Sequence, residues 1–104
     1  MTIKYKYSGR GYSSRENQAL SLDKELLVAF YRDMLRIRRI EEEIESRYHE
    51  DEMKSPIHLV MGHEAVSVGS CSALKKDDLI YCGHRTHGHY LAKGGSLKGM
   101  LSEL

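Results

Sequence analysis

The sequence has no apolar run near the ~18 residues that a membrane-spanning helix needs, which argues against a membrane protein. Its first residues lack the apolar centre of a signal peptide, so we do not expect secretion. Only two cysteines are present, Cys71 and Cys82, too few for a disulfide framework and typical of the reducing cytoplasm. An excess of either charge is also absent, and the net charge of +1 excludes nucleic-acid binding driven by overall charge.

The composition is that of a small globular protein, with 104 residues, 40% of them hydrophobic and 30% charged, and with room for one domain. Residues 1–20 differ from the rest, because they mix Gly, Ser, Lys and Tyr without the periodicity of a helix or a strand. We expect a flexible N-terminal arm there. The alternative is that Tyr5, Tyr7 and Tyr12 dock on a partner chain.

A long amphipathic helix is predicted from about residue 22 to residue 52, with Ser21 as its N-cap. The charged stretch RIRRIEEEIESR (36–47) is interpreted as its solvated face, with contact to a partner as the alternative. Ion pairs one turn apart are expected on this face at Arg38–Glu42, Arg39–Glu43 and Glu43–Arg47. The apolar face repeats every three or four positions, at Leu27, Phe30, Met34, Ile37, Ile40, Ile44 and Tyr48.

A second helix is predicted to open at residues 62–64 and to end at about residue 74. Ala65, Gly69 and Ala73 fall on one side of it, at steps of four residues. Because such small side chains let another backbone come close, we expect this side to pack against a neighbour.

The apolar run Leu79-Ile80-Tyr81-Cys82, ended by Gly83, predicts a single short strand over residues 79–83. A strand needs hydrogen-bonding partners, and the sequence offers no second strand to supply them. We therefore expect the chain to be a piece of a larger protein, or a subunit that completes a neighbour.

Two cationic side chains, His84 and Arg85, follow this strand directly. A short helix over 86–93 capped by Thr86 comes next, and Ser96 caps a last helix over 97–104. A strand end, a guanidinium and a helix start suit a phosphate or diphosphate at the carboxyl edge of a parallel sheet. An ordinary polar loop is the alternative interpretation.

Imidazoles offer two more hypotheses. His58 lies in the apolar segment 57–61, where it is either a buried core residue or a catalytic group. A small zinc site made of Cys82, His84, His87 and His89 is the weaker hypothesis, because their spacing matches no zinc-binding pattern.

Several separate motifs resemble one family. They are YRDMLRIRRIEE (31–42), HL (58–59), GHEAVSVG (62–69), AL (73–74), DD (77–78) and HRTHGH (84–89). Their order and spacing over about residues 25–104 are similar to the opening of the E1 α subunit of thiamine-diphosphate-dependent 2-oxo acid dehydrogenases. Within that family, the pyruvate and acetoin dehydrogenase branch is the most similar.

The resemblance implies an α/β fold. Residues 21–104 would be an incomplete N-terminal segment of a thiamine-diphosphate-binding domain built on a parallel sheet. This segment would be mostly helical, with the strand over about 79–83 as its one contribution to the sheet.

The resemblance also implies roles for single residues. His58 corresponds to the active-site histidine near the thiazolium and the substrate, which helps in proton handling or acyl transfer. Arg85 corresponds to the arginine that binds the cofactor diphosphate, and His84 stands where pyruvate enzymes usually have a tyrosine that contacts it. His63 stands where the family often has Gln or Glu and is left out of the site. Glu64 is not the activating glutamate, which the β subunit supplies.

The family's Gly-Asp-Gly…Asn-Asn motif for magnesium and diphosphate does not occur in the sequence. We therefore expect Mg²⁺ to be held by the missing C-terminal part or by another chain, with no metal ligands here. The implied function is part of an E1 α component in the oxidative decarboxylation of pyruvate or the cleavage of acetoin. The implied partners are the remainder of E1 α or a complementing chain, E1 β and, indirectly, the E2 acyltransferase. A non-catalytic assembly fragment of an E1-like complex is the alternative.

Overall fold

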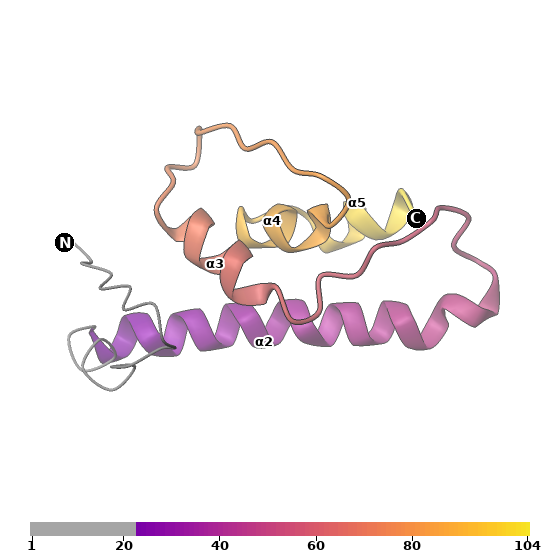
Figure 1. Ribbon diagram of the computed structural model, residues 1–104, viewed down its shortest axis with the longest axis horizontal. Coiled ribbons are helices and arrows are strands. Elements are labelled where there is room, and N and C mark those ends of the chain that lie inside the picture. Colours follow the sequence, from indigo (N-terminus) through magenta and orange to yellow (C-terminus); the bar gives the residue numbers. More distant parts are fainter. Residues whose placement is uncertain (1–22) are drawn as a thin grey trace, which may run out of the picture.

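The computed structural model describes residues 23–104, so the expected arm over 1–20 and the expected cap at Ser21 lie outside the described residues. Figure 1 shows the long helix with the shorter helices lying along one side of it. None of the helices within residues 23–104 combines the length and apolar character of a membrane crossing. The elements are α2 (Lys24–Arg47), the 3-10 turn η1 (Tyr48–Glu50), α3 (Glu64–Ser72), α4 (Thr86–Ala92) and α5 (Leu97–Ser102).

Helix α2 begins and ends through local contacts. Its N-cap is Asp23, whose carboxylate accepts a hydrogen bond from Leu26 N at 3.3 Å. The predicted extension to residue 52 is too long, because the α-helix ends at Arg47 and η1 follows. Asp51 then reverses the chain with a left-handed backbone at φ 59°.

The short helices also follow the predicted boundaries closely. In α5, Ser96 is the predicted cap and its Oγ accepts from Gly99 N at 3.2 Å. In α4, the capping position is occupied by Arg85 and not by Thr86, which is the first helical residue. This helix ends as predicted before Gly94, whose φ of 87° favours glycine.

One small core joins all the helices. Helix α2 packs its predicted apolar face into this core, and the most deeply buried residues of that face are Ile37 and Ile44. The segment before α3 lies across α2 (Figure 1). The radius of gyration of 16.0 Å exceeds the roughly 12–13 Å of a compact chain of this size. The long helix α2 extends beyond the shorter helices, so much of it lies outside the core (Figure 1). The core consists of Ile37, Ile44, Val60, Val68, Leu91 and Met100.

The predicted strand over 79–83 is wrong for this structure, which has coil there and no strand anywhere in residues 23–104. Backbone groups of residues 79–83 form no hydrogen bond within the described chain. Leu79 and Tyr81 are 81% and 92% exposed, and the loop runs on the side of α3 and α4 away from α2 (Figure 1). The physical reason is that a strand exists only when paired, and no described segment lies alongside to pair with it. The mostly helical character is confirmed, whereas the full α/β fold stays a prediction.

The small-residue side of α3 faces solvent. Ala65, Gly69 and Ala73 are exposed, and the helix buries the opposite side through Ser67, Val68 and Cys71. The expected packing of this stripe against a neighbour therefore finds no partner among residues 23–104 and stays a prediction.

Candidate functional site

The three predicted site residues lie together, although they come from two separate segments. The imidazole rings of His58 and His84 are 5.0 Å apart between centroids, with their planes tilted by 47°. Arg85 donates from Nε to the carbonyl oxygen of Leu59 at 3.0 Å. The segment before α3 and the turn before α4 thus meet at one exposed cluster.

The Arg85 guanidinium is held through one nitrogen, and its terminal nitrogens remain available to a ligand. Its Nε is used by the Leu59 carbonyl, and the side chain is in an exposed position. No ion pair within residues 23–104 involves this guanidinium. A guanidinium anchored through Nε can present its terminal nitrogens as a fork to a phosphate group, and His84 adds an imidazole donor beside it.

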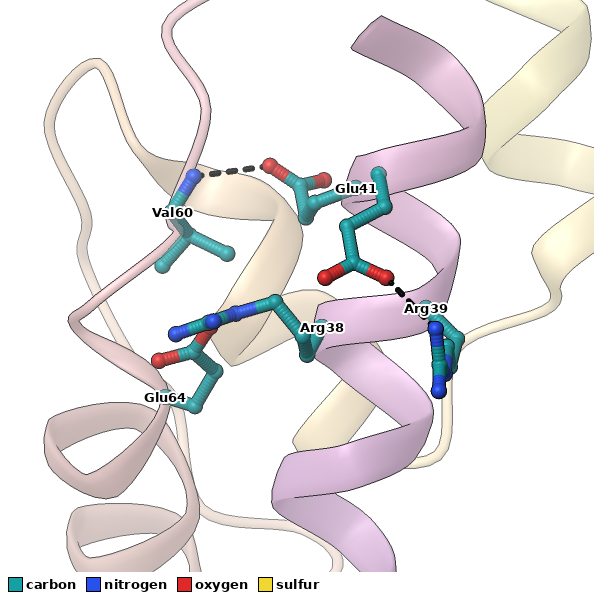
Figure 2. A network of polar contacts seen from close by, with 6 residues as sticks. Arg38, Arg39, Glu41, Val60 and Glu64 are labelled. Carbon is teal, nitrogen blue, oxygen red and sulfur yellow. Dashed lines mark hydrogen bonds and ion pairs between the residues drawn. The ribbon is translucent and has the colours of Figure 1, made fainter. Parts of the chain in front are cut away.

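A buried carboxylate lies behind this cluster and was missed by the sequence analysis. Glu41 is 0% exposed and points from α2 to the backbone of Val60, as Figure 2 shows. Its Oε2 accepts from Val60 N at 2.7 Å, and its Oε1 shares a 2.7 Å hydrogen bond with His87 Nδ1. The interpretation of residues 36–47 as a solvated face is therefore wrong at Glu41. The available signal was its register, four residues after Ile37 and three before Ile44.

A second polar contact joins α2 to the start of α3. Arg38 Nε and Glu64 Oε1 are 2.5 Å apart (Figure 2), so the predicted pair of Arg38 with Glu42 is not formed. Glu42 pairs instead with Arg39 at 3.1 Å. The contact reaches an element far along the chain, which periodicity within one helix could not predict. Of the expected ion pairs, only Glu43–Arg47 is confirmed.

The Arg38–Glu64 pair predicts a dependence of stability on pH. The hydrogen bond from Arg38 lowers the pKa of Glu64, and its positive charge acts in the same direction. A lowered folded-state pKa means that the unfolded chain binds more protons, so this stability is present above about pH 4–5 and is lost as the pH falls through the folded pKa. We expect Glu64→Gln to remove this part of the acid sensitivity.

The measurement is urea unfolding of the wild-type and Glu64→Gln proteins between pH 3 and pH 6, monitored by circular dichroism. The wild-type unfolding free energy should fall more steeply toward acid than that of Glu64→Gln. Parallel curves for the two proteins would show that the pair contributes nothing to the pH dependence.

Residues 32–104 match the protein family described as "Dehydrogenase E1 component". The chain belongs to this E1 family. It is 38% identical over 89 residues to the α subunit of acetoin:2,6-dichlorophenolindophenol oxidoreductase of Bacillus subtilis (strain 168), a match that covers 86% of this chain and 27% of that protein. It is 46% identical over 74 residues to the pyruvate dehydrogenase E1 component subunit α of Rhizobium meliloti (strain 1021), covering 71% of this chain and 21% of that protein.

The matches confirm the resemblance to E1 α subunits of the pyruvate and acetoin dehydrogenase branch. This E1 chain spans about a quarter of the length of the curated relatives that it matches, with 27% and 28% for the two acetoin proteins. No solved structure is significantly similar to it.

The zinc hypothesis finds no support in the E1 chain. Within residues 23–104, no three metal-ligating side chains gather at one place. His87 is bonded to Glu41, and His89 is turned inward with Nδ1 buried and unpartnered among the described residues. Cys82 lies exposed in the coil that precedes the site.

Proposed function

We propose that this chain is part of the E1 α component of a thiamine-diphosphate-dependent dehydrogenase, acting on pyruvate or acetoin. Arg85 and His84 would bind the cofactor diphosphate, and His58 would act at the reacting end. The single observation that carries the proposal is the meeting of these three side chains across two segments. The relatives named as pyruvate dehydrogenase and acetoin oxidoreductase subunits support the substrate class.

The cationic cluster fits a diphosphate on chemical grounds. A diphosphate carries several acceptor oxygens, and Arg85 and His84 offer donors that no described carboxylate occupies through an ion pair. Anchoring of Nε on the Leu59 carbonyl fixes the direction of the guanidinium before a ligand arrives. Mg²⁺, which such a diphosphate needs, would be held by the remainder of E1 α or by another chain.

His58 would move protons at the substrate. When bound, thiamine diphosphate supplies a nucleophilic thiazolium carbon for attack on a 2-oxo acid or acetoin carbonyl. His58 is exposed beside His84, so its imidazole is accessible to a substrate while the adjoining residues Leu59 and Val60 are held by hydrogen bonds. An imidazole suits this role because its ordinary pKa lies near neutrality.

The proposal includes the partners that such chemistry needs. They are the remainder of E1 α or a complementing chain, E1 β and, indirectly, the E2 acyltransferase; neither a nucleic acid nor a membrane is among them. A cytoplasmic location stays a prediction, and some relatives carry "mitochondrial" or "chloroplastic" in their names. We call this chain, together with the remainder of E1 α and E1 β, the E1 assembly.

Thiamine diphosphate titration of the E1 assembly tests the proposal. Arg85→Ala should raise the dissociation constant about 10- to 100-fold, because charge-assisted hydrogen bonds contribute about 1.5–3 kcal/mol. Arg85→Lys should recover part of the loss, since it keeps the charge but not the fork. Affinity for thiamine without phosphates should not change.

The matched control is Arg39→Ala, because Arg39 is an exposed arginine that lies on the side of α2 away from Val60 (Figure 2). If Arg85→Ala binds thiamine diphosphate as tightly as Arg39→Ala, the cofactor assignment is wrong. That result favours the alternative of a non-catalytic assembly fragment.

A further inference from the structure

A single peptide unit between His58 and α3 is held at both of its polar ends. The carbonyl of Leu59 accepts from Arg85 Nε at 3.0 Å, and the N–H of Val60 donates to Glu41 Oε2 at 2.7 Å. These two groups belong to the same peptide bond, between Leu59 and Val60, one residue after His58. The plane of that peptide, and so the direction in which the chain runs from Leu59 to Val60, is fixed from two sides.

The second oxygen of Glu41 closes this arrangement into a ring. Glu41 Oε1 bonds His87 Nδ1 at 2.7 Å, and His87 follows Arg85 by two residues, as the second residue of α4. Contacts therefore run from Glu41 to the 59–60 peptide, on to Arg85, along the backbone to His87 and back to Glu41. Hydrogen bonds linked in this way polarise and so strengthen one another, which favours a single arrangement of these three groups.

We propose that Glu41 is a positioning residue that sets the segment 57–61 against the turn 84–87. Through this ring it directs the Arg85 guanidinium outward and places His58 against His84. Its consequence for the cofactor rests on the proposed function, whereas the geometry of the ring does not. Glu41 itself is wholly buried, so it acts through the groups that it bonds.

The location of Glu41 supports positioning over simple stabilisation. It lies on the core face of α2 between Ile37 and Ile44, the other two buried residues of this helix, which are apolar. Burying a carboxylate there is costly and is offset only by hydrogen bonds of good geometry. Both of its bonds go to the two segments that carry the candidate site, which an apolar residue could not hold in register.

Three variants of the E1 assembly test this inference. Glu41→Ala removes both hydrogen bonds. Glu41→Gln can keep both. The amide oxygen can accept from Val60 N, and the amide nitrogen can donate to His87 Nδ1 when the imidazole carries its hydrogen on Nε2. Glu42→Ala is the matched control, since Glu42 is the next residue and its ion pair among residues 23–104 is with the exposed Arg39.

The first measurement is hydrogen exchange of the peptide that contains residues 57–61. Protection of the Val60 amide should fall at least about tenfold in Glu41→Ala and stay unchanged in Glu41→Gln and Glu42→Ala, because the amide loses its acceptor only in the first. The second is thiamine diphosphate affinity, which should weaken about tenfold in Glu41→Ala alone. Glu41→Ala combined with Arg85→Ala should bind no more weakly than Arg85→Ala, because Glu41 acts through Arg85.

Unchanged protection of Val60 in Glu41→Ala overturns the inference, as does a Glu41→Gln variant that is as weak as Glu41→Ala. Where Glu41→Ala does not assemble, His87→Leu removes one corner of the ring, and His87→Asn restores an N–H near the Nδ1 position. Leu should then lower the protection in part, because the Glu41 carboxylate keeps its bond to Val60 N but loses the contact that orients it. Asn should reverse this loss, and equal behaviour of the two variants overturns the inference. If Arg85→Ala leaves cofactor affinity unchanged, the proposed function fails, and exchange at Val60 alone decides the role of Glu41.

Discussion

Replacing Gly88 by alanine should weaken the packing of α4 on α3 and lower the free energy of local unfolding of α4 by about 2–3 kcal/mol. This is the upper part of the range for an overpacked core. A Cβ at Gly88 would lie 2.3 Å from Ser67 Oγ and 2.9 Å from Val60 Cγ2. Ser67 and Val60 are 0% and 1% exposed, so neither has free space into which to move. Because α4 follows Arg85 directly, the displacement should also move the candidate site.

Hydrogen exchange of α4 peptides in the E1 assembly measures this effect. Protection should fall about 30- to 150-fold, since each 1.4 kcal/mol is a factor of ten. Ser67→Ala in the same chain should recover part of the loss, because the hydroxyl that it removes is the nearest obstacle and has no partner among the described residues.

Gly69→Ala is the matched control for Gly88→Ala. Gly69 lies within α3, on the side away from α4, and a Cβ there meets nothing within 4 Å among residues 23–104. Alanine should therefore leave protection unchanged or raise it, by up to about 1 kcal/mol from its better helix propensity. Similar protection in the Gly88 and Gly69 variants would show that the close approach of α3 and α4 is not needed.

Replacing His58 by alanine should lower turnover of the E1 assembly about 100-fold or more, while thiamine diphosphate affinity stays within about threefold. Removal of a positioned acid–base group costs about 10²- to 10⁴-fold in rate. Affinity should be spared because the donors proposed for the diphosphate are those of Arg85 and His84. Steady-state rates and cofactor titration of the same preparation separate the two effects.

His63→Ala is the control, because His63 is another exposed imidazole only five residues further along. It should keep near-wild-type turnover. If His58→Ala retains turnover comparable to His63→Ala, His58 has no part in proton transfer. A parallel loss of affinity in His58→Ala would instead make it a binding residue.

The helices were predictable because their signals are local. Caps such as Ser96, the left-handed position at Gly94 and the hydrophobic repeat of α2 all act within a few residues. The strand over 79–83 was predicted wrongly because pairing is not a local property, and apolar composition alone does not create a ladder. The same limit explains why Arg38 was assigned to Glu42 on its own helix and bonds Glu64 on another.

The three candidate site residues could be named from the sequence and their roles stay a prediction, whereas their arrangement in space could not be predicted. The family motifs named His58, His84 and Arg85, whereas only the structure brings the two segments that carry them into contact. Glu41 was missed because it stands in a run of charges, although its register on the helix is that of a core residue. The charged composition of the stretch predicted an exposed Glu41, whereas its position on the helix predicts a buried one.

The proposed contact between Arg85 and the cofactor can be tested directly by solid-state nuclear magnetic resonance of the E1 assembly, labelled with ¹⁵N-arginine and loaded with thiamine diphosphate. Dephasing of the guanidinium ¹⁵N signal by ³¹P should match a separation of about 4 Å or less, as expected for a charge-assisted contact. The dephased signal should disappear in Arg85→Ala and persist in Arg39→Ala. Equal dephasing with and without Arg85 would contradict the assignment of this turn to the diphosphate.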